Sequence, residues 1–125
     1  MHSLSSILDE LGGHSSIRER RAVRRIAELD EQIFPELVAA SRHHPNAFAR
    51  AVAVKSLARF SRSALRPVLR ALRDPAMPVR LAALLTLDRL WTGAVPPAVI
   101  RLLNDSSPSI RTNAAMVLAR HGVRR

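Results

Sequence analysis

One segment of this chain occurs four times, and this repetition restricts the possible folds more than any other feature. The four copies superpose on a small central residue, with separations of 31, 30 and 31 residues. These central residues are Ala22, Ala53, Ala83 and Ala114. A branched aliphatic residue follows four positions later in every copy, and an apolar residue follows seven positions later in three of the four. Offsets of 0, 4 and 7 lie on one helix face, so the pattern predicts four similar amphipathic helices.

A second, shorter helix is predicted before each of these four helices. Pro35, Pro67 and Pro97 each precede a short apolar run, and proline is favoured in the first turn of a helix. The apolar residues within 4–11 have the same role at the N-terminus, without a proline, and two glycines end that helix. Each repeat is therefore expected to be a hairpin of two unequal helices. The apolar composition is mostly Ala, Leu and Val, which also favours an all-α protein.

The link between the two helices carries a regular polar pair. Asp74 and Asp105 lie just before longer helices, and Arg80 and Arg111 each follow their aspartate by six residues. A carboxylate at this position can accept hydrogen bonds from the backbone amides that begin the longer helix. The same pattern, an Asp in the turn, a Val-Arg or Ile-Arg pair, then Ala and Leu, resembles the short HEAT repeats that also occur in the phycobilisome-lyase group.

The resemblance extends over the whole chain and is clearest in its third and fourth repeats. His44 stands in the Asp position of the second repeat, while Gly13 and Glu19 stand in the Asp and Arg positions of the first. The resemblance implies an all-α, right-handed, armadillo-like α-solenoid of four HEAT-like hairpins. It would form one domain over 1–125, with repeats at approximately 1–30, 31–61, 62–92 and 93–125.

The resemblance also implies a structural role for the arginines that follow the turns. In the family, such an arginine bridges its own aspartate and that of a neighbouring repeat, which produces a ladder of polar contacts. We therefore expect Arg50, Arg80 and Arg111 to stabilise the fold and not to bind a ligand.

The formal net charge is +10, but it is unevenly distributed. Residues 1–36 hold 5 Arg against 7 acidic residues, whereas residues 37–125 hold 15 Lys and Arg against 3 acidic residues. Such asymmetry is typical of a protein that binds an anionic partner. A genome of high GC content would give the same arginine-rich composition, so this signal alone does not identify a partner.

The longer helices of this family line a concave surface. The residues that stand two and six positions after each central alanine are expected to face it. The candidate partner-binding residues at these positions are Lys55, Arg59, Leu85, Arg89, Met116 and Arg120. Two interpretations of the arginines stay open. They could form a cationic ridge that contacts a polyanion, or they could complement the helix macrodipoles and solvate the surface.

Extra apolar residues in the C-terminal half indicate a contact surface for a partner or for a second copy of the chain. Leu81 and Val117 accompany Leu85 and Met116 there, although neighbouring repeats could also bury them. The fourth repeat lacks a clearly polar outer face, so a homodimer through that end is a further expectation. Trp91 could anchor a partner or cover the end of the core.

The sequence contains no motif that indicates catalysis or a cofactor. It has no cysteine, no glycine-rich phosphate loop and no catalytic carboxylate pair, and Asp88 is expected to pair with Arg89, Arg120 or a turn amide. The adjacent His43 and His44 lack a third ligand at useful spacing, so no metal site is expected. No signal peptide or membrane-spanning run is apparent, and a cytoplasmic location away from membranes is expected.

These observations lead to three hypotheses about function. The first is a non-enzymatic scaffold that binds another protein through the concave face. The second is binding of nucleic-acid phosphates through the basic ridge, although the scarcity of aromatic residues argues against base stacking. The third is a lyase-like subunit or chaperone for protein modification, and it depends on the family resemblance alone.

Overall fold

The computed structural model describes residues 3–122, and its regular elements over this range are all helices. Its α-helices are α1 (Leu4–Asp9), α2 (Ser16–Ala27), α3 (Phe34–His43), α4 (Ala47–Ser56), α5 (Leu65–Ala71), α6 (Met77–Leu90), α7 (Pro97–Arg101) and α8 (Pro108–Arg120). Short 3-10 segments occupy Glu31–Ile33, Leu57–Ala64 and Leu102–Asn104. No helix in the described part is long and apolar enough to cross a membrane.

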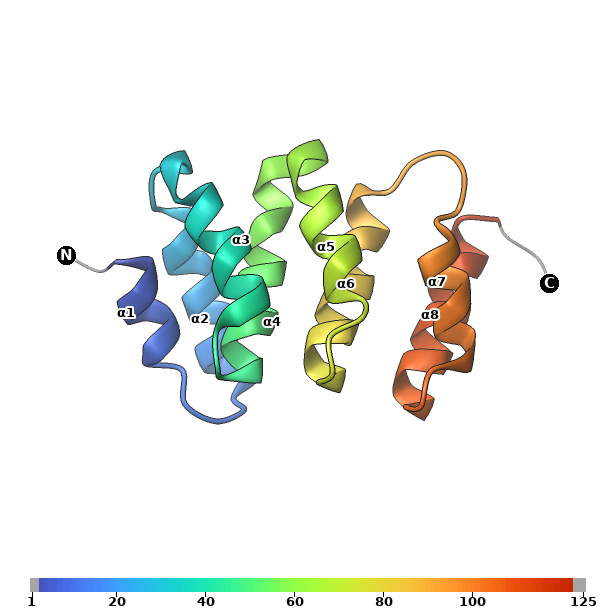
Figure 1. The fold of residues 1–125 in the computed structure, drawn as a ribbon, viewed down its shortest axis with the longest axis horizontal. Helices are drawn as coiled ribbons and strands as arrows, with labels where there is room; N and C mark the ends of the chain where they lie inside the picture. The colour runs from blue at the N-terminus through green and yellow to red at the C-terminus, as the bar shows by residue number, and fades with distance from the viewer. Residues whose placement is uncertain (1–2, 123–125) are drawn as a thin grey trace.

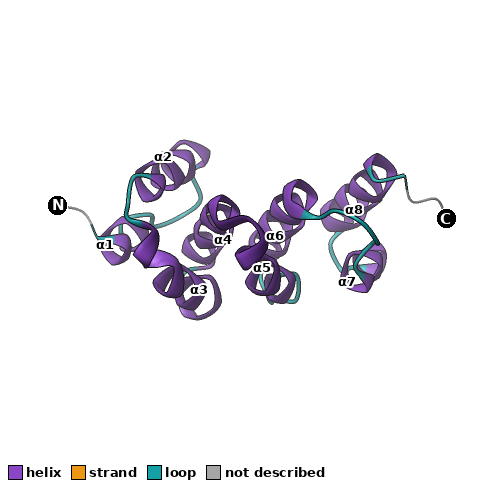
Figure 2. Ribbon diagram, turned by 90° about the horizontal axis from the view of Figure 1, so that it is seen from above, coloured by secondary structure: helices purple, strands orange, loops and turns teal. Residues whose placement is uncertain are grey.

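The helices form two layers that run side by side from one end of the molecule to the other (Figure 1). Viewed from above, α1, α3, α5 and α7 lie in one layer and α2, α4, α6 and α8 lie in the other (Figure 2). Each odd-numbered helix packs against the even-numbered helix that follows it, and α4 also packs against α2 and α6. This stacking of helix pairs is consistent with an α-solenoid.

The predicted apolar stripe is the core of the molecule. The central alanines are buried, and three of them have no accessible surface. The residues four positions later are also buried, namely Ile26, Leu57, Leu87 and Leu118. Small side chains at the centre of α4, Ala51 and Ala53, let the neighbouring helices approach closely, because they occupy little volume between the two backbones.

The second helix pair differs from the expected pair of unequal helices. Both α3 and α4 have 10 residues, because the α-helical part of α4 ends at Ser56 and the chain continues as the 3-10 segment Leu57–Ala64. Ser61 interrupts that segment with a φ of 52°. Phe60 therefore lies outside the α-helix that the repeat pattern predicted, and its ring packs against Phe34 with 4.9 Å between the ring centroids.

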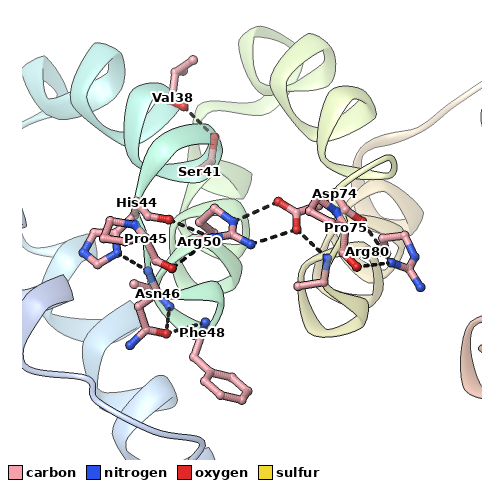
Figure 3. A network of polar contacts seen from close by, with 12 residues as sticks. Val38, Ser41, His44, Pro45, Asn46, Phe48, Arg50, Asp74, Pro75 and Arg80 are labelled. Carbon is pink, nitrogen blue, oxygen red and sulfur yellow. Dashed lines mark hydrogen bonds and ion pairs between the residues drawn. The ribbon is translucent and has the colours of Figure 1, made fainter.

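Arginine–aspartate contacts join successive helix pairs, as the resemblance implied (Figure 3). The Arg50 guanidinium donates two hydrogen bonds to the Asp74 carboxylate, at 3.0 and 3.1 Å. Arg80 repeats this arrangement on Asp105, with both distances at 3.0 Å. The four side chains are at most 14% exposed. Such bidentate pairs fix both the distance and the orientation of the groups they join.

Each arginine also contacts its own turn, but through the backbone and not through the expected carboxylate. Arg50 Nη1 donates to the His44 carbonyl at 2.8 Å, and Arg80 Nη1 donates to the Asp74 carbonyl at 3.0 Å. Arg111 makes the same contact with the Asp105 carbonyl at 2.7 Å. Among the described residues, Arg111 has no carboxylate partner, so its expected contact with a neighbouring repeat is not seen.

The turn carboxylates have a second role, which is to hold the backbone of the turn just before the longer helix. Asp74 accepts a hydrogen bond from the backbone N–H two residues later, and Asp105 does the same. His44 replaces the carboxylate in the second repeat, because its Nδ1 accepts the Asn46 N–H at 3.0 Å. An accepting Nδ1 requires the ring proton on Nε2, which lies 2.8 Å from Asp9 Oδ1. The imidazole therefore holds the turn before α4 and joins it to the preceding pair, while the Asn46 side chain caps α4 itself.

Removal of the Asp74 carboxylate should destabilise the protein strongly. In Asp74→Ala, the mostly buried Arg50 guanidinium loses its anionic partner and the Ala76 N–H loses its acceptor, so we expect a loss of about 3 kcal/mol in the free energy of unfolding. Urea unfolding followed by circular dichroism measures this loss. Asp30→Ala is the control, because Asp30 only caps the exposed Gln32 N–H and should cost about 1 kcal/mol. Equal losses would show that the pairing with Arg50 adds nothing beyond the backbone hydrogen bond that the carboxylate accepts.

Asp105 should make part of the stability depend on acidic pH. Burial alone raises the pKa of Asp105, but the Ser107 N–H, the hydrogen bond and charge of Arg80, and the charge of Arg111 together hold it below the ordinary 3.8. The unfolded chain therefore binds a proton at pH values where the folded protein does not. The resulting stabilisation is complete above about pH 5 and is lost as the pH falls through the lowered pKa.

The variant Asp105→Asn tests this origin of the pH dependence. We expect it to be less stable than the parent protein near neutral pH and to lose less stability between about pH 5 and pH 3. Urea midpoints measured across this range give both pH profiles. Parallel profiles for the two proteins would contradict the assignment.

Candidate functional site

A groove lies in the even-numbered layer, between α2, α4 and α6. It consists of two adjoining hollows of about 480 Å³ each, and both are lined by Glu19, Lys55, Ala82 and Leu85. We call this continuous feature the inter-helix groove. The three helices lie side by side in one layer (Figure 2).

The two ends of the inter-helix groove differ in chemistry. One end is lined by the cationic side chains Arg20, Arg24 and Arg89. The other end is lined mainly by apolar side chains, namely Phe48, Met77, Pro78 and Leu81, together with His14. A surface with separate charged and apolar ends suits a ligand that has the same division.

Three of the six predicted partner-binding residues meet in this groove. Leu85 is 40% exposed, although it is a large apolar residue. The Lys55 side chain is 43% exposed and lies beside it, and Arg89 is exposed at the cationic end. The structure therefore brings together Lys55, Leu85 and Arg89, which come from α4 and α6.

The other three predicted residues do not line the groove. Arg59 Nη1 donates to the Ile26 carbonyl at 3.1 Å and to the Ala27 carbonyl at 3.4 Å, where α2 ends. Arg120 pairs with Asp88, which confirms the expected pairing of that acid. Met116 is 51% exposed on α8. Because Arg59 and Arg120 have partners within the chain, the three arginines do not act as one uncommitted cationic ridge.

Of the two further apolar candidates, Val117 belongs to the core and Leu81 packs against it. Val117 has no accessible surface, because it lies on the side of α8 that packs against the preceding pair. Leu81 is partly buried against the core, although it also lines the apolar end of the groove. The interpretation of Val117 as part of a contact surface was therefore wrong, and neighbouring helices bury it.

Trp91 covers the end of the core. It is 6% exposed, and its Nε1 donates to the Gly93 and Ala94 carbonyls. Its ring stacks on His121 with 3.7 Å between the ring centroids, and His121 Nε2 lies 2.9 Å from Asp88 Oδ1. This cluster joins α6 to the end of α8. The sequence signal for it was available, since Asp88 replaces an alanine and His121 replaces an apolar residue at the corresponding repeat positions.

Glu19 is the functional candidate that the sequence reasoning missed. It occupies the position of the ladder arginines but is only 6% exposed, and its carboxylate lies between the two hollows. His14 Nδ1 lies 2.9 Å from Oε2 and Lys55 Nζ lies 3.6 Å from Oε1. The His14 contact is not aligned as a hydrogen bond, so Oε2 lacks a hydrogen-bond partner in the described part of the chain.

His44 and its neighbours have structural contacts. The ring of His44 accepts from Asn46 and meets Asp9. Within residues 3–122, no group of three His, Cys, Asp or Glu side chains is placed to hold a metal ion.

Replacing an arginine that has hydrogen-bond partners within the chain should lower the free energy of unfolding more than replacing one that has none. Arg59→Ala removes the hydrogen bonds to the end of α2 and should cost about 1 kcal/mol in the free energy of unfolding. Arg89→Ala should change it by less than about 0.5 kcal/mol, because Arg89 has no ion pair or side-chain hydrogen bond within residues 3–122. Urea unfolding of both variants checks this, and a larger loss for Arg89→Ala would refute the division.

Comparison with known proteins places the chain among helical repeat proteins. A family model described as HEAT repeats matches residues 34–119, which is more than half of the chain. No curated protein matches the sequence. The matched region runs from the start of α3 almost to the end of α8 and includes both arginine–aspartate contacts between helix pairs. The chain therefore belongs to the HEAT-repeat family.

Proposed function

We propose that this chain is a non-enzymatic scaffold that binds a protein partner through the inter-helix groove. HEAT repeats commonly mediate contacts between proteins, which supports this class of function. The observation that carries the proposal is the meeting of Lys55, Leu85 and Arg89 in one groove, with a large apolar side chain exposed between cations. Protein interfaces often have such an apolar centre with a polar rim.

The surface chemistry also favours a partner over solvent alone. Four large apolar residues are exposed within the described chain, and two of them, Met77 and Leu85, line the groove. Burial of apolar area stabilises a complex by roughly 25 cal/mol per Å² before the costs of association. Two neighbouring apolar side chains in a hollow therefore offer more binding energy than the same residues scattered on a convex surface.

The proposal also covers the number of repeats, the handedness of the solenoid, and the location and assembly of the protein. The helix pairs would form four repeats of a right-handed solenoid, with the groove on its concave face. A relation to the phycobilisome-lyase group, and with it a lyase-like or chaperone role, stays a prediction from the repeat motifs. A cytoplasmic location and a homodimer through α8 also stay predictions.

Binding to nucleic-acid phosphates is the alternative. The engagement of Arg59 and Arg120 within the chain reduces the cations available along the predicted ridge. We therefore favour the protein partner.

A capture experiment tests the groove. The full chain is immobilised, exposed to a lysate of its own source, and the retained proteins are quantified by mass spectrometry. Leu85→Ser should abolish retention of the specific partner, because it removes the apolar centre of the groove. Ile17→Ser is the matched control, since Ile17 is 63% exposed but does not line the groove, and it should leave retention unchanged.

Met116→Ser distinguishes the groove from a site on α8. If Met116→Ser abolishes retention while Leu85→Ser does not, the partner binds at α8 and the groove assignment is wrong. Circular dichroism of each variant establishes that the helical fold is unchanged.

A further inference from the structure

We infer that the inter-helix groove recognises an acidic peptide segment that carries one large apolar side chain. This inference rests on the proposed function and specifies the chemistry of the partner. The carboxylates would meet Arg20, Arg24 and Arg89 at one end of the groove, and the apolar side chain would enter the hollow at the other end.

The cationic end is the first part of the evidence. Arg20 and Arg24 lie one turn apart on α2, and Arg89 approaches the same hollow from α6. None of the three has an ion pair or side-chain hydrogen bond within residues 3–122, whereas Arg50, Arg80 and Arg120 each pair with a carboxylate. Three guanidinium groups around one hollow repel each other, and carboxylates would relieve that repulsion through charge-assisted hydrogen bonds.

The apolar end is the second part. Met77 is 37% exposed and Leu85 is 40% exposed, and the half-buried Phe48 and Leu81 complete the hollow. An inserted aliphatic or aromatic side chain would bury these surfaces together with its own. Thioether and aromatic walls adapt to side chains of different shape, so size and hydrophobicity would matter more than residue identity.

Glu19 sets the orientation of the segment. Its carboxylate is mostly buried where the two hollows join, beside His14 and Lys55. Because Glu19 pairs with Lys55, the junction has no uncompensated cation to attract an acidic ligand residue, while the three arginines lie only at the far end. The carboxylates and the apolar side chain of the ligand would therefore lie at opposite ends of the groove.

The apolar end also separates a peptide from a nucleic acid. A sugar-phosphate backbone would leave Met77, Leu81 and Leu85 without a complementary surface, whereas a peptide can supply carboxylates and an apolar side chain within a few residues. The groove, with its three arginines at one end and its apolar hollow at the other, is thus better matched by an acidic peptide than by a polyphosphate chain.

Selection from a random peptide library tests the chemistry of the groove directly, because every combination of charged and apolar residues competes for it. Phage-displayed peptides are selected on the full chain, and enriched peptides are synthesised with a fluorescent label for anisotropy titrations. We expect the enriched sequences to combine Asp or Glu with Leu, Ile, Met or Phe. Replacing either the acidic residues or the apolar residue of an enriched peptide by serine should weaken binding at least about tenfold.

Paired charge reversals locate the binding site. The double variant Arg24→Glu, Arg89→Glu should weaken the same peptides at least about tenfold. Arg66→Glu, Arg70→Glu is the matched control, because it makes the same change in net charge on exposed residues of α5 and should leave affinity unchanged. Circular dichroism and urea midpoints show whether both variants keep the fold.

The outcomes separate failure of this inference from failure of the proposed function. Enriched peptides that are basic or uncharged, yet lose binding in Leu85→Ser, would overturn the acidic chemistry and leave the groove as the interface. The absence of any peptide that depends on Leu85 would overturn both. Displacement of the peptides by a generic DNA duplex, with the same dependence on Arg24 and Arg89, would assign the groove to nucleic acid.

Discussion

The bidentate contact between an arginine of one helix pair and the turn aspartate of the next determines the distance between those two helix pairs. Asp74 illustrates the constraint, because one carboxylate accepts two bonds from Arg50 and also accepts the Ala76 N–H just before α6. The helix that begins at the turn is therefore held in a defined position relative to the preceding pair. The α4–α6 side of the inter-helix groove depends on this contact, since Arg50 belongs to α4 and Asp74 precedes α6.

Much of the fold follows from residues that the sequence repeats. A buried alanine and an aliphatic residue one turn later recur at constant spacing, and identical spacing on a helix gives identical burial. The role of Arg50 and Arg80 was predictable for the same reason, because the turn aspartates also recur. Leu85 was recognisable as exposed because the helix already had a complete apolar stripe without it.

The remaining features depend on contacts that a repeat pattern does not encode. Arg59 and Arg89 occupy equivalent positions, yet only Arg59 donates to carbonyl groups at the end of a preceding helix within the described residues. The shortening of α4 at Ser56 likewise reflects how its chain turns into α5 and not its apolar spacing. Glu19 was missed because it departs from the pattern, and departures acquire meaning only once their neighbours, His14 and Lys55, are located in space.

The two contacts between an arginine and a turn aspartate have a direction: in both, the guanidinium comes from the N-terminal pair and the carboxylate from the C-terminal pair. A whole hairpin that carries its own Asp and Arg could therefore be inserted between two existing pairs, accept from Arg50 and donate to Asp74. After such an insertion every buried charge would still have a partner of opposite charge. Gain or loss of a single helix would leave a buried charge without a partner. Gene duplication can thus lengthen an array of this kind in units of one hairpin, and the binding surface would grow by the same increment.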